Sequence, residues 1–198
     1  MDAPALRLEP WTDADLGLLR LINTPEMRRH VGGPESEERM LVRHRRYLDF
    51  VPAGIGCMYR VVLETDGPET GRVGSGGAGP DGVGSGGVGS GGVDVGSVGY
   101  AERAWQGGTV YEMGWNVLAP YRGRGIAATA ARAAVEAAAR TARHRHLHAF
   151  PSVDHPASNA VCRKAGFTLV GETDFEFPPG RWMRSNDWRV DLSALRGA

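Results

Sequence analysis

The sequence has few cysteines, no net charge and no long apolar run. Its two cysteines, Cys57 and Cys162, are too few for a disulfide framework, and neither lies in a CxxC pair. Lys and Arg together number 23, as do Asp and Glu, so no overall charge favours nucleic acid or an anionic membrane as a partner. Because no apolar run approaches the length of a bilayer span and the N-terminus opens with an acid, we expect a soluble, cytoplasmic protein without a membrane partner.

Length and composition predict one domain over residues 1–198. A chain of 198 residues, 41% of them hydrophobic, is long enough for one well-packed core and short for two. Residues 71–92 repeat the pattern Val-Gly-Ser-Gly-Gly and offer little that could fill a core. They are interpreted as a flexible Gly/Ser-rich insertion between two strands. A phosphate-cradling loop is the alternative, although the segment has no Lys and no helical pattern follows it.

Hydrophobic periodicity predicts a mixed order of strands and helices. Strands are expected at residues 6–9, 58–63, 95–105, 109–117, 147–150, 167–173 and 188–192. Helices are expected at residues 16–22, 36–50, 126–140 and 156–165, the last one ended by Gly166. This order predicts an α/β domain built on a mixed sheet.

The clearest chemical feature is the turn between the strand that ends near Val117 and the helix that begins near Ile126. No Ser, Thr, Asp or Asn is present to cap this helix, so its first amides lack side-chain acceptors and carry the positive end of the helix dipole. Gly123 and Gly125 allow a ligand to approach the backbone closely. These features favour an anion such as a pyrophosphate as the missing cap.

Two common phosphate motifs do not describe this turn. A Walker loop would need a Lys-Ser/Thr pair, and a dinucleotide fingerprint would need Gly at position 128, where the chain has Ala128. Arg122 and Arg124 could add charge-assisted contacts to an anion. The alternative is a tight strand-to-helix turn with two solvated arginines.

Three segments of the sequence resemble the GNAT superfamily of N-acetyltransferases. Residues 122–127, Arg-Gly-Arg-Gly-Ile-Ala, match its acetyl-CoA signature Q/R-x-x-G-x-G/A with Ala in the last place. Residues 158–167 are similar to the helix of this family that ends in K-x-G-F, and residues 6–16 resemble the start of the ribosomal-protein N-terminal acetyltransferase branch. The resemblance implies a mixed, mostly antiparallel central sheet flanked by helices, with acetyl-CoA as acetyl donor and no metal.

The resemblance also implies roles for individual residues. The amides of residues 124–127 would hold the pyrophosphate, the backbone of the preceding strand end would pair with the pantetheine arm and polarise the thioester carbonyl, and the later helix would flank the cofactor. The implied cofactor-binding set is Val117, Leu118, Arg122, Gly123, Arg124, Gly125, Ile126, Ala127, Ser158 and Asn159.

Two residues are predicted to move protons. Acetyl transfer needs an unprotonated amine, so a base or a water chain must accept a proton, and Glu112 is the best-placed carboxylate by sequence. Strand alternation puts Glu112 on one face with Gly114 and Asn116, unless a bulge of the kind that the family often carries resets the order. A purely structural carboxylate is the alternative.

Cys162 occupies the position where many members of the family have a Tyr that protonates the departing thiolate. Cys162 is therefore the second predicted catalytic residue, with a small packed core residue as the alternative. His155 stands where the family usually has Asn.

Two further patterns remain open. His144, His146 and His148 alternate and could face one way as zinc ligands, although a solvated helix end leading into a strand explains them better. The aromatic and proline residues between Asp174 and Trp188 could border an acceptor pocket, or belong to the core or a homodimer contact.

These observations lead to one expected activity and two competing interpretations. The expected activity is transfer of an acetyl group from acetyl-CoA to the primary amine of a small molecule or a protein N-terminus. The first competitor is a catalytically inactive acyl-CoA-binding regulatory module. The second is an anion-binding or structural domain.

Overall fold

The computed structural model describes residues 4–64 and 92–195, which form one seven-stranded sheet and four α-helices. The strands are β1 (Leu6–Pro10), β2 (Gly56–Glu64), β3 (Gly92–Trp105), β4 (Gly108–Val117), β5 (His146–Ala149), β6 (Thr168–Glu176) and β7 (Trp182–Asp191). The α-helices are α1 (Leu16–Ile22), α2 (Glu37–Asp49), α3 (Ile126–Thr141) and α4 (Pro156–Lys164). The predicted insertion at residues 71–92 lies outside the described residues except for Gly92, which begins β3.

The sheet has the order β1-β2-β3-β4-β5-β7-β6. All neighbouring strands are antiparallel except β4 and β5, which run parallel. The β4–β5 ladder is short, with only the pairs Tyr111↔Leu147 and Glu112↔His148. Beyond Glu112 the two strands diverge, so the last five residues of β4 have a strand neighbour on the β3 side alone.

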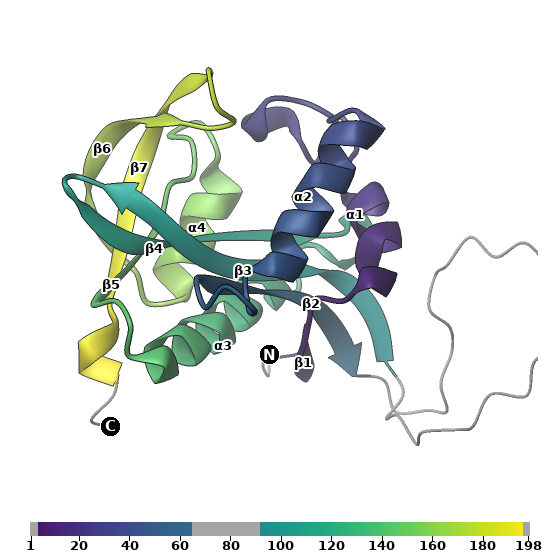
Figure 1. Ribbon diagram of the computed structural model, residues 1–198, viewed down its shortest axis with the longest axis horizontal. Helices are drawn as coiled ribbons and strands as arrows, with labels where there is room; N and C mark the ends of the chain where they lie inside the picture. The colour runs from purple at the N-terminus through teal and green to yellow at the C-terminus, as the bar shows by residue number, and fades with distance from the viewer. Residues whose placement is uncertain (1–3, 65–91, 196–198) are drawn as a thin grey trace, which may run out of the picture.

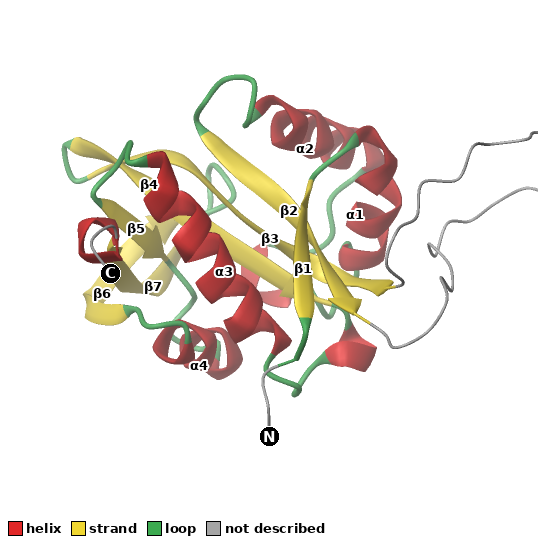
Figure 2. Ribbon diagram, turned by 90° about the horizontal axis from the view of Figure 1, so that it is seen from below, coloured by secondary structure: helices red, strands yellow, loops and turns green. Residues whose placement is uncertain are grey.

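Helices cover both faces of the sheet (Figures 1 and 2). The Ala-rich helix α3 packs on one face, where Ala131, Ala134 and Ala138 are fully buried against strand residues such as Val95 and Leu147. Small side chains let the helix approach the sheet closely. On the other face, α1 and α2 enclose a second cluster. Its buried members are Trp11, Leu18, Leu19, Ile22, Met40, Phe50 and Met58.

The structure confirms the predicted fold class, a mixed and mostly antiparallel sheet flanked by helices. The predicted helices agree with α1 to α4 within two residues at each end. The predicted alternation in β4 is also confirmed, because the β3–β4 register is unbroken from Gly96↔Val117 to Trp105↔Gly108. Tyr111 and Met113 are buried on the α3 face, while Glu112 points to the other face.

The last two strands are longer than the sequence predicts. β6 and β7 form a hairpin paired from Thr168↔Arg189 to Glu176↔Trp182. Residues 184–187 read Arg-Ser-Asn-Asp, and such a polar run gives no hydrophobic signal for a strand. Main-chain pairing to β6 and the burial of Ser185 and Asp187 place this run in the sheet nonetheless.

None of the described helices is both long and apolar enough to cross a bilayer.

Candidate functional site

The start of α3 presents main-chain amides that have no hydrogen-bond acceptor in the part of the chain that the structure describes. Gly125 is the N-cap residue, with φ +80°, and Gly123 has φ +77°; both values favour glycine. No side chain caps the helix. The first intrahelical bonds are donated by Ala128 and Thr129 to the carbonyl of Gly125. Among the described residues, nothing accepts a hydrogen bond from the amides of residues 123–127.

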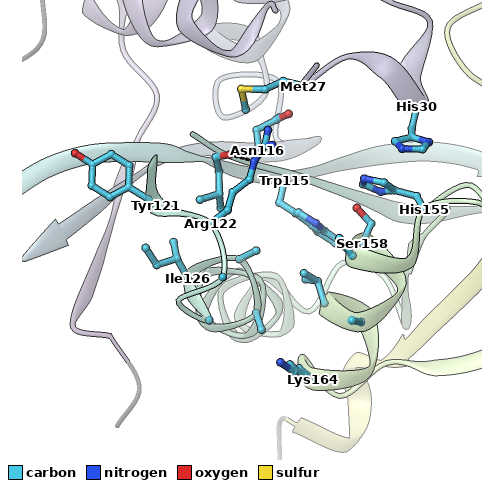
Figure 3. Close-up of a pocket in the computed structure, with 18 of the residues that line it drawn as sticks. Met27, His30, Trp115, Asn116, Tyr121, Arg122, Ile126, His155, Ser158 and Lys164 are labelled. Atoms are coloured by element: carbon cyan, nitrogen blue, oxygen red, sulfur yellow. Dashed lines mark hydrogen bonds between the residues drawn. The ribbon is translucent and has the colours of Figure 1, made fainter. Parts of the chain in front are cut away.

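These amides open onto a cavity of about 450 Å³. A Cβ atom added at Gly123 would meet no atom within 4 Å, and one at Gly125 would come no closer than 3.9 Å, to Cδ of Pro4. Figure 3 shows the cavity between the end of β4, the start of α3 and one side of α4. Seven residues of the predicted cofactor set line it: Val117 at the end of β4, Arg122, Gly123, Gly125, Ile126 and Ala127 from the first motif, and Ser158 from the second.

The two arginines of the signature differ in their positions. Arg122 lines the cavity, where its Nε donates to the carbonyl of Val117 at 3.1 Å and its Nη1 is paired with Glu26. Arg124 points away, because its Nη2 donates to the carbonyl of Pro120 at 3.2 Å and its guanidinium lies over the ring of Tyr121. Arg122 is therefore positioned to contact an anion in the cavity, while Arg124 stabilises the turn.

The backbone at the end of β4 alternates between the two sides of the strand. The amide of Leu118 donates to the carbonyl of Val95 at 2.9 Å, and its own carbonyl accepts from Tyr121. This corrects the expectation that Leu118 pairs with a pantetheine arm, since its amide is already bonded to β3 and Leu118 does not line the cavity. By the antiparallel alternation, the amides of Val117 and Trp115 point away from β3, toward the space left by the divergence of β5.

Helix α4 turns Ser158 toward the cavity and Asn159 away from it. The side-chain amide of Asn159 donates to the carbonyls of Ser152 and His155, both at 2.9 Å. Its oxygen accepts from Nδ2 of Asn186 at 2.7 Å and from Nε1 of Trp188 at 2.8 Å. The last two bonds join α4 to β7, and the four together leave Asn159 no free group for a cofactor, which corrects the expectation that it binds one.

Cys162 lies in the core rather than at the cavity. Its side chain is completely buried in the cluster between α3, α4 and the sheet. Burial raises the pKa of the Cys162 thiol to about 12, which leaves it a poor source of protons. The placement corrects the expectation that Cys162 is catalytic and supports the alternative of a packed core residue.

A second cavity, of about 500 Å³, adjoins the first. Six residues line both cavities and form what we call the junction: Met27, His30, Trp115, Asn116, His155 and Ser158. Figure 3 shows the His30 and His155 rings side by side and the Trp115 side chain directed toward α4. The second cavity starts at the junction and extends into the space between β4 and α2. Glu112 is one of the residues that line it.

Glu112 lies on the wall of the second cavity, where its Oε2 accepts from Nη1 of Arg103 at 2.9 Å. Burial raises the pKa of the Glu112 carboxyl, although the neighbouring Arg103 acts in the opposite direction. A carboxylate with a raised pKa binds a proton more readily than an exposed one, which is what a general base requires.

The two imidazoles of the junction have ring centroids 4.0 Å apart. Burial lowers the pKa of His155 to about 4, and the charges of His30 and Arg122 add to this effect. His155 is therefore neutral near pH 7. Sequence reasoning noted His155 only as a departure from the family and did not single out His30, because it lies in a short 3-10 helix (Arg29–Val31) without a motif.

The three alternating histidines, His144, His146 and His148, have different partners and do not converge on one site. His144 contacts a carboxylate oxygen of Glu102 at 2.8 Å, His148 is buried beside Asp187 at 2.6 Å, and His146 stays half-buried at the start of β5. Within residues 4–64 and 92–195, no group of three His, Cys, Asp or Glu side chains is arranged to hold a metal ion.

The aromatic segment between Asp174 and Trp188 also divides. Phe175 and Phe177 line the second cavity, together with Pro179. Trp188 is buried in the core, and Trp182 is 66% exposed. Part of this segment thus borders the candidate acceptor cavity, while part serves the core.

Comparison with known proteins gives one family match. The sequence profile of the Acetyltransferase (GNAT) domain matches residues 5–168. No curated protein sequence matches the chain.

Several solved structures share the fold at low sequence identity. RimL, the ribosomal L7/L12 alpha-N-protein acetyltransferase in complex with coenzyme A, superposes with a TM-score of 0.68 at 18% identity, covering 96% of this chain and 95% of that one. Spermidine N-acetyltransferase from Vibrio cholerae, in complex with CoA and spermine, gives 0.67 at 15% identity, covering 96% and 97%. Ribosomal-protein-S5-alanine acetyltransferase from Vibrio fischeri gives 0.67 at 11% identity, covering 99% and 98%.

Proposed function

The chain belongs to the GNAT family of acetyltransferases, and on this premise we propose that it transfers an acetyl group from acetyl-CoA to the primary amine of a small molecule or a protein N-terminus. One observation carries the proposal: the unbonded amides of residues 123–127 open onto a cavity that continues, through the junction, to a second cavity. The first cavity would hold the donor and the second the acceptor.

The diphosphate of the cofactor would take the place of the missing helix cap. Several amides and the positive end of the α3 dipole converge there, and an anion at such a terminus is stabilised by both. Arg122 would add a charge-assisted contact from the cavity wall. The pantetheine arm would then follow β4 toward the junction, paired with the main chain of Val117 and Trp115.

Acetyl transfer would take place at the junction. The amine nitrogen attacks the thioester carbonyl carbon, a C–N bond forms, and the C–S bond breaks to release a thiolate. Main-chain amides at the end of β4 would stabilise the negative charge that develops on the carbonyl oxygen.

Two protons must move in this reaction. The attacking nitrogen loses one, and Glu112 would accept it. Glu112 and Trp115 are three residues apart on β4, about 10 Å along the strand, so water molecules would relay this proton. The thiolate gains the other, for which Ser158 and the imidazoles of His30 and His155 are nearer than the buried Cys162.

The cofactor site is tested with Gly125→Glu. The new side chain places bulk and negative charge in front of the amides, so we expect loss of CoA binding, measured by calorimetry, and loss of CoA release from acetyl-CoA. Gly107→Glu is the matched control: Gly107 has the same φ of +80° but belongs to the β3–β4 turn, away from both cavities. Normal CoA affinity in Gly125→Glu would refute the placement.

A catalytically inactive acyl-CoA-binding module is the second candidate. It is favoured by the burial of Cys162 at the position where the family often has a tyrosine acid. The two candidates differ in one measurement, the release of CoA in the presence of a panel of amines. Tight acetyl-CoA binding without release by any amine would favour the binding module.

A further inference from the structure

One wall of the second cavity holds more positive charge than its protein partners balance. Arg28 and Arg43 both line this wall, and both are at least nine-tenths buried. They share a single carboxylate, that of Glu35: Nη2 of Arg28 lies 3.0 Å from Oε1, and Nη2 of Arg43 lies 2.8 Å from Oε2. Two guanidinium groups and one carboxylate leave one positive charge in excess.

The hydrogen-bonding groups of Arg43 are incompletely used. Neither Nε nor Nη2 makes a hydrogen bond to a described residue, although Nη2 lies at ion-pair distance from Glu35. Arg28 is better bonded, because its Nε donates to the carbonyl of Gly33 at 3.1 Å and its Nη2 donates to Glu35. A buried cation with unused donors is costly unless an anion or another acceptor reaches it.

The excess charge affects the neighbouring groups. Burial lowers the pKa of Arg28, and the charge of Arg43 lowers it further. Arg46 follows Arg43 by three residues on α2 and lines the same cavity, and its charge acts to lower the pKa of Glu112. The α2 side of the cavity is therefore positive, and an anion entering it would be attracted.

The rest of the cavity differs in character from the α2 wall. Glu112 lies on β4, the strand that leads to the junction. The surface between the α2 wall and Glu112 is largely aromatic. The rings of Phe150 and Phe175 are stacked there, with their centroids 4.2 Å apart. Other aromatic side chains on this surface are Tyr47, Phe50, Tyr100 and Phe177.

We propose that the acceptor is an amine that also carries a carboxylate and an apolar body, with the carboxylate bound by Arg43 and Arg28. This inference rests on the proposed acetyl transfer and specifies its substrate class. The amine would reach the junction, the apolar body would contact the aromatic side chains, and the carboxylate would offset the excess charge on the α2 wall. Polyamines, with several positive charges and no anion, would be repelled by the same wall.

The carboxylate could belong to a free amino acid or to an acidic side chain near a peptide N-terminus. A first set of amines consists of phenylalanine, phenylalaninamide, phenethylamine and spermidine; CoA release is measured at one near-neutral pH, and each rate is divided by the fraction of the amine that is unprotonated. A second set consists of two tripeptide amides, Ser-Asp-Phe and Ser-Asn-Phe. In at least one set, we expect the amine that bears a carboxylate to have a kcat/KM about tenfold or more above those of the members that lack it. This is the usual effect of a charge-assisted contact.

The variants Arg43→Met and Arg46→Met test the assigned wall. Each should raise KM for the preferred carboxylate-bearing amine and leave CoA affinity unchanged. Arg46 is exposed, so its replacement keeps the test valid if Arg43→Met fails to fold. Arg45→Met is the matched control, because Arg45 is an exposed neighbour on α2 that lines neither cavity.

The outcomes separate this inference from the proposed function. Equal rates with and without the carboxylate, or a preference for spermidine, would overturn the inference while acetyl transfer itself stands. If none of these amines nor any other releases CoA, both fall. An unchanged KM in both arginine variants, with the carboxylate preference intact, would also overturn the assignment to this wall.

Discussion

At the residue scale, the environment of each group decides its role more than its type does. Glu112 and Cys162 were both predicted to move protons. The structure places Glu112 at a cavity and Cys162 inside the core. Burial raises both pKa values, but only Glu112 is positioned to exchange a proton with a ligand.

Replacement of Glu112 by Gln should lower turnover and leave CoA binding intact. The base is the ionised carboxylate, so wild-type activity should rise with pH through the raised pKa of Glu112. Glu112→Gln should lack this rise and have a kcat reduced by about 10²-fold or more. Rates of CoA release between pH 5 and 9 check the prediction, and an unchanged profile would remove Glu112 from the mechanism.

His155 should make the protein sensitive to moderate acid. Its pKa is lowered from 6.5 to about 4 in the folded state, so between these values the unfolded chain binds a proton that the folded chain does not. Folding stability therefore falls as pH decreases from about 6.5 to about 4. Thermal midpoints at pH 7, 6 and 5 should decline less in His155→Asn than in the wild type. Parallel declines would contradict this assignment.

At the scale of elements, apolar patterns predicted the helices and the inner strands, but not which way each side chain points. Ser158 and Asn159 were assigned together to the cofactor. Adjacent helical residues differ by about 100° in direction, so one faces the cavity and the other faces β7. The sequence alone does not fix the rotation of α4, because that depends on packing against Trp188 and the rest of the core.

The glycines of the α3 turn were predictable because their role is local. Gly123 and Gly125 adopt positive φ within a few residues of the strand end, and the absence of a capping residue is visible in the sequence. The arginine wall was not predictable. Arg28 and Arg43 belong to a loop and a helix that meet only in the folded chain, and the carboxylate that they share lies between them in sequence.

The pairing of β5 with β7 includes a buried polar contact that should matter for stability. Nδ1 of His148 and Oδ1 of Asp187 are 2.6 Å apart, and both residues are only 4% exposed. Replacing His148 by Ala leaves a buried carboxylate without its partner, which should cost about 3–5 kcal/mol of unfolding free energy. Urea unfolding measures the change. His146→Ala, on the same strand but half-buried, serves as control, and equal losses in the two variants would argue against a special contribution from the buried pair.

At the scale of the whole molecule, the two cavities proposed for the donor and the acceptor are formed by different elements. The first cavity is formed mainly by α3, α4 and the end of β4, and the second mainly by α2, β4 and the β6–β7 hairpin. The tip of that hairpin lies beside the segment that precedes α2, because a Cβ at Gly32 would come within 2.9 Å of Cδ of Pro178 (Figure 1). The second cavity is thus bounded by segments far apart in the chain.

The short ladder between β4 and β5 has a mechanical consequence. Strands β1 to β4 and strands β5 to β7 share only the pairs at Tyr111 and Glu112. A cofactor arm that is bonded to the free edge of β4 and also contacts α4 would link strands β1 to β4 with the part of the molecule that contains β5 to β7. Loading the donor would then stiffen the molecule at the shortest ladder of its sheet, and release of CoA would restore the flexibility there.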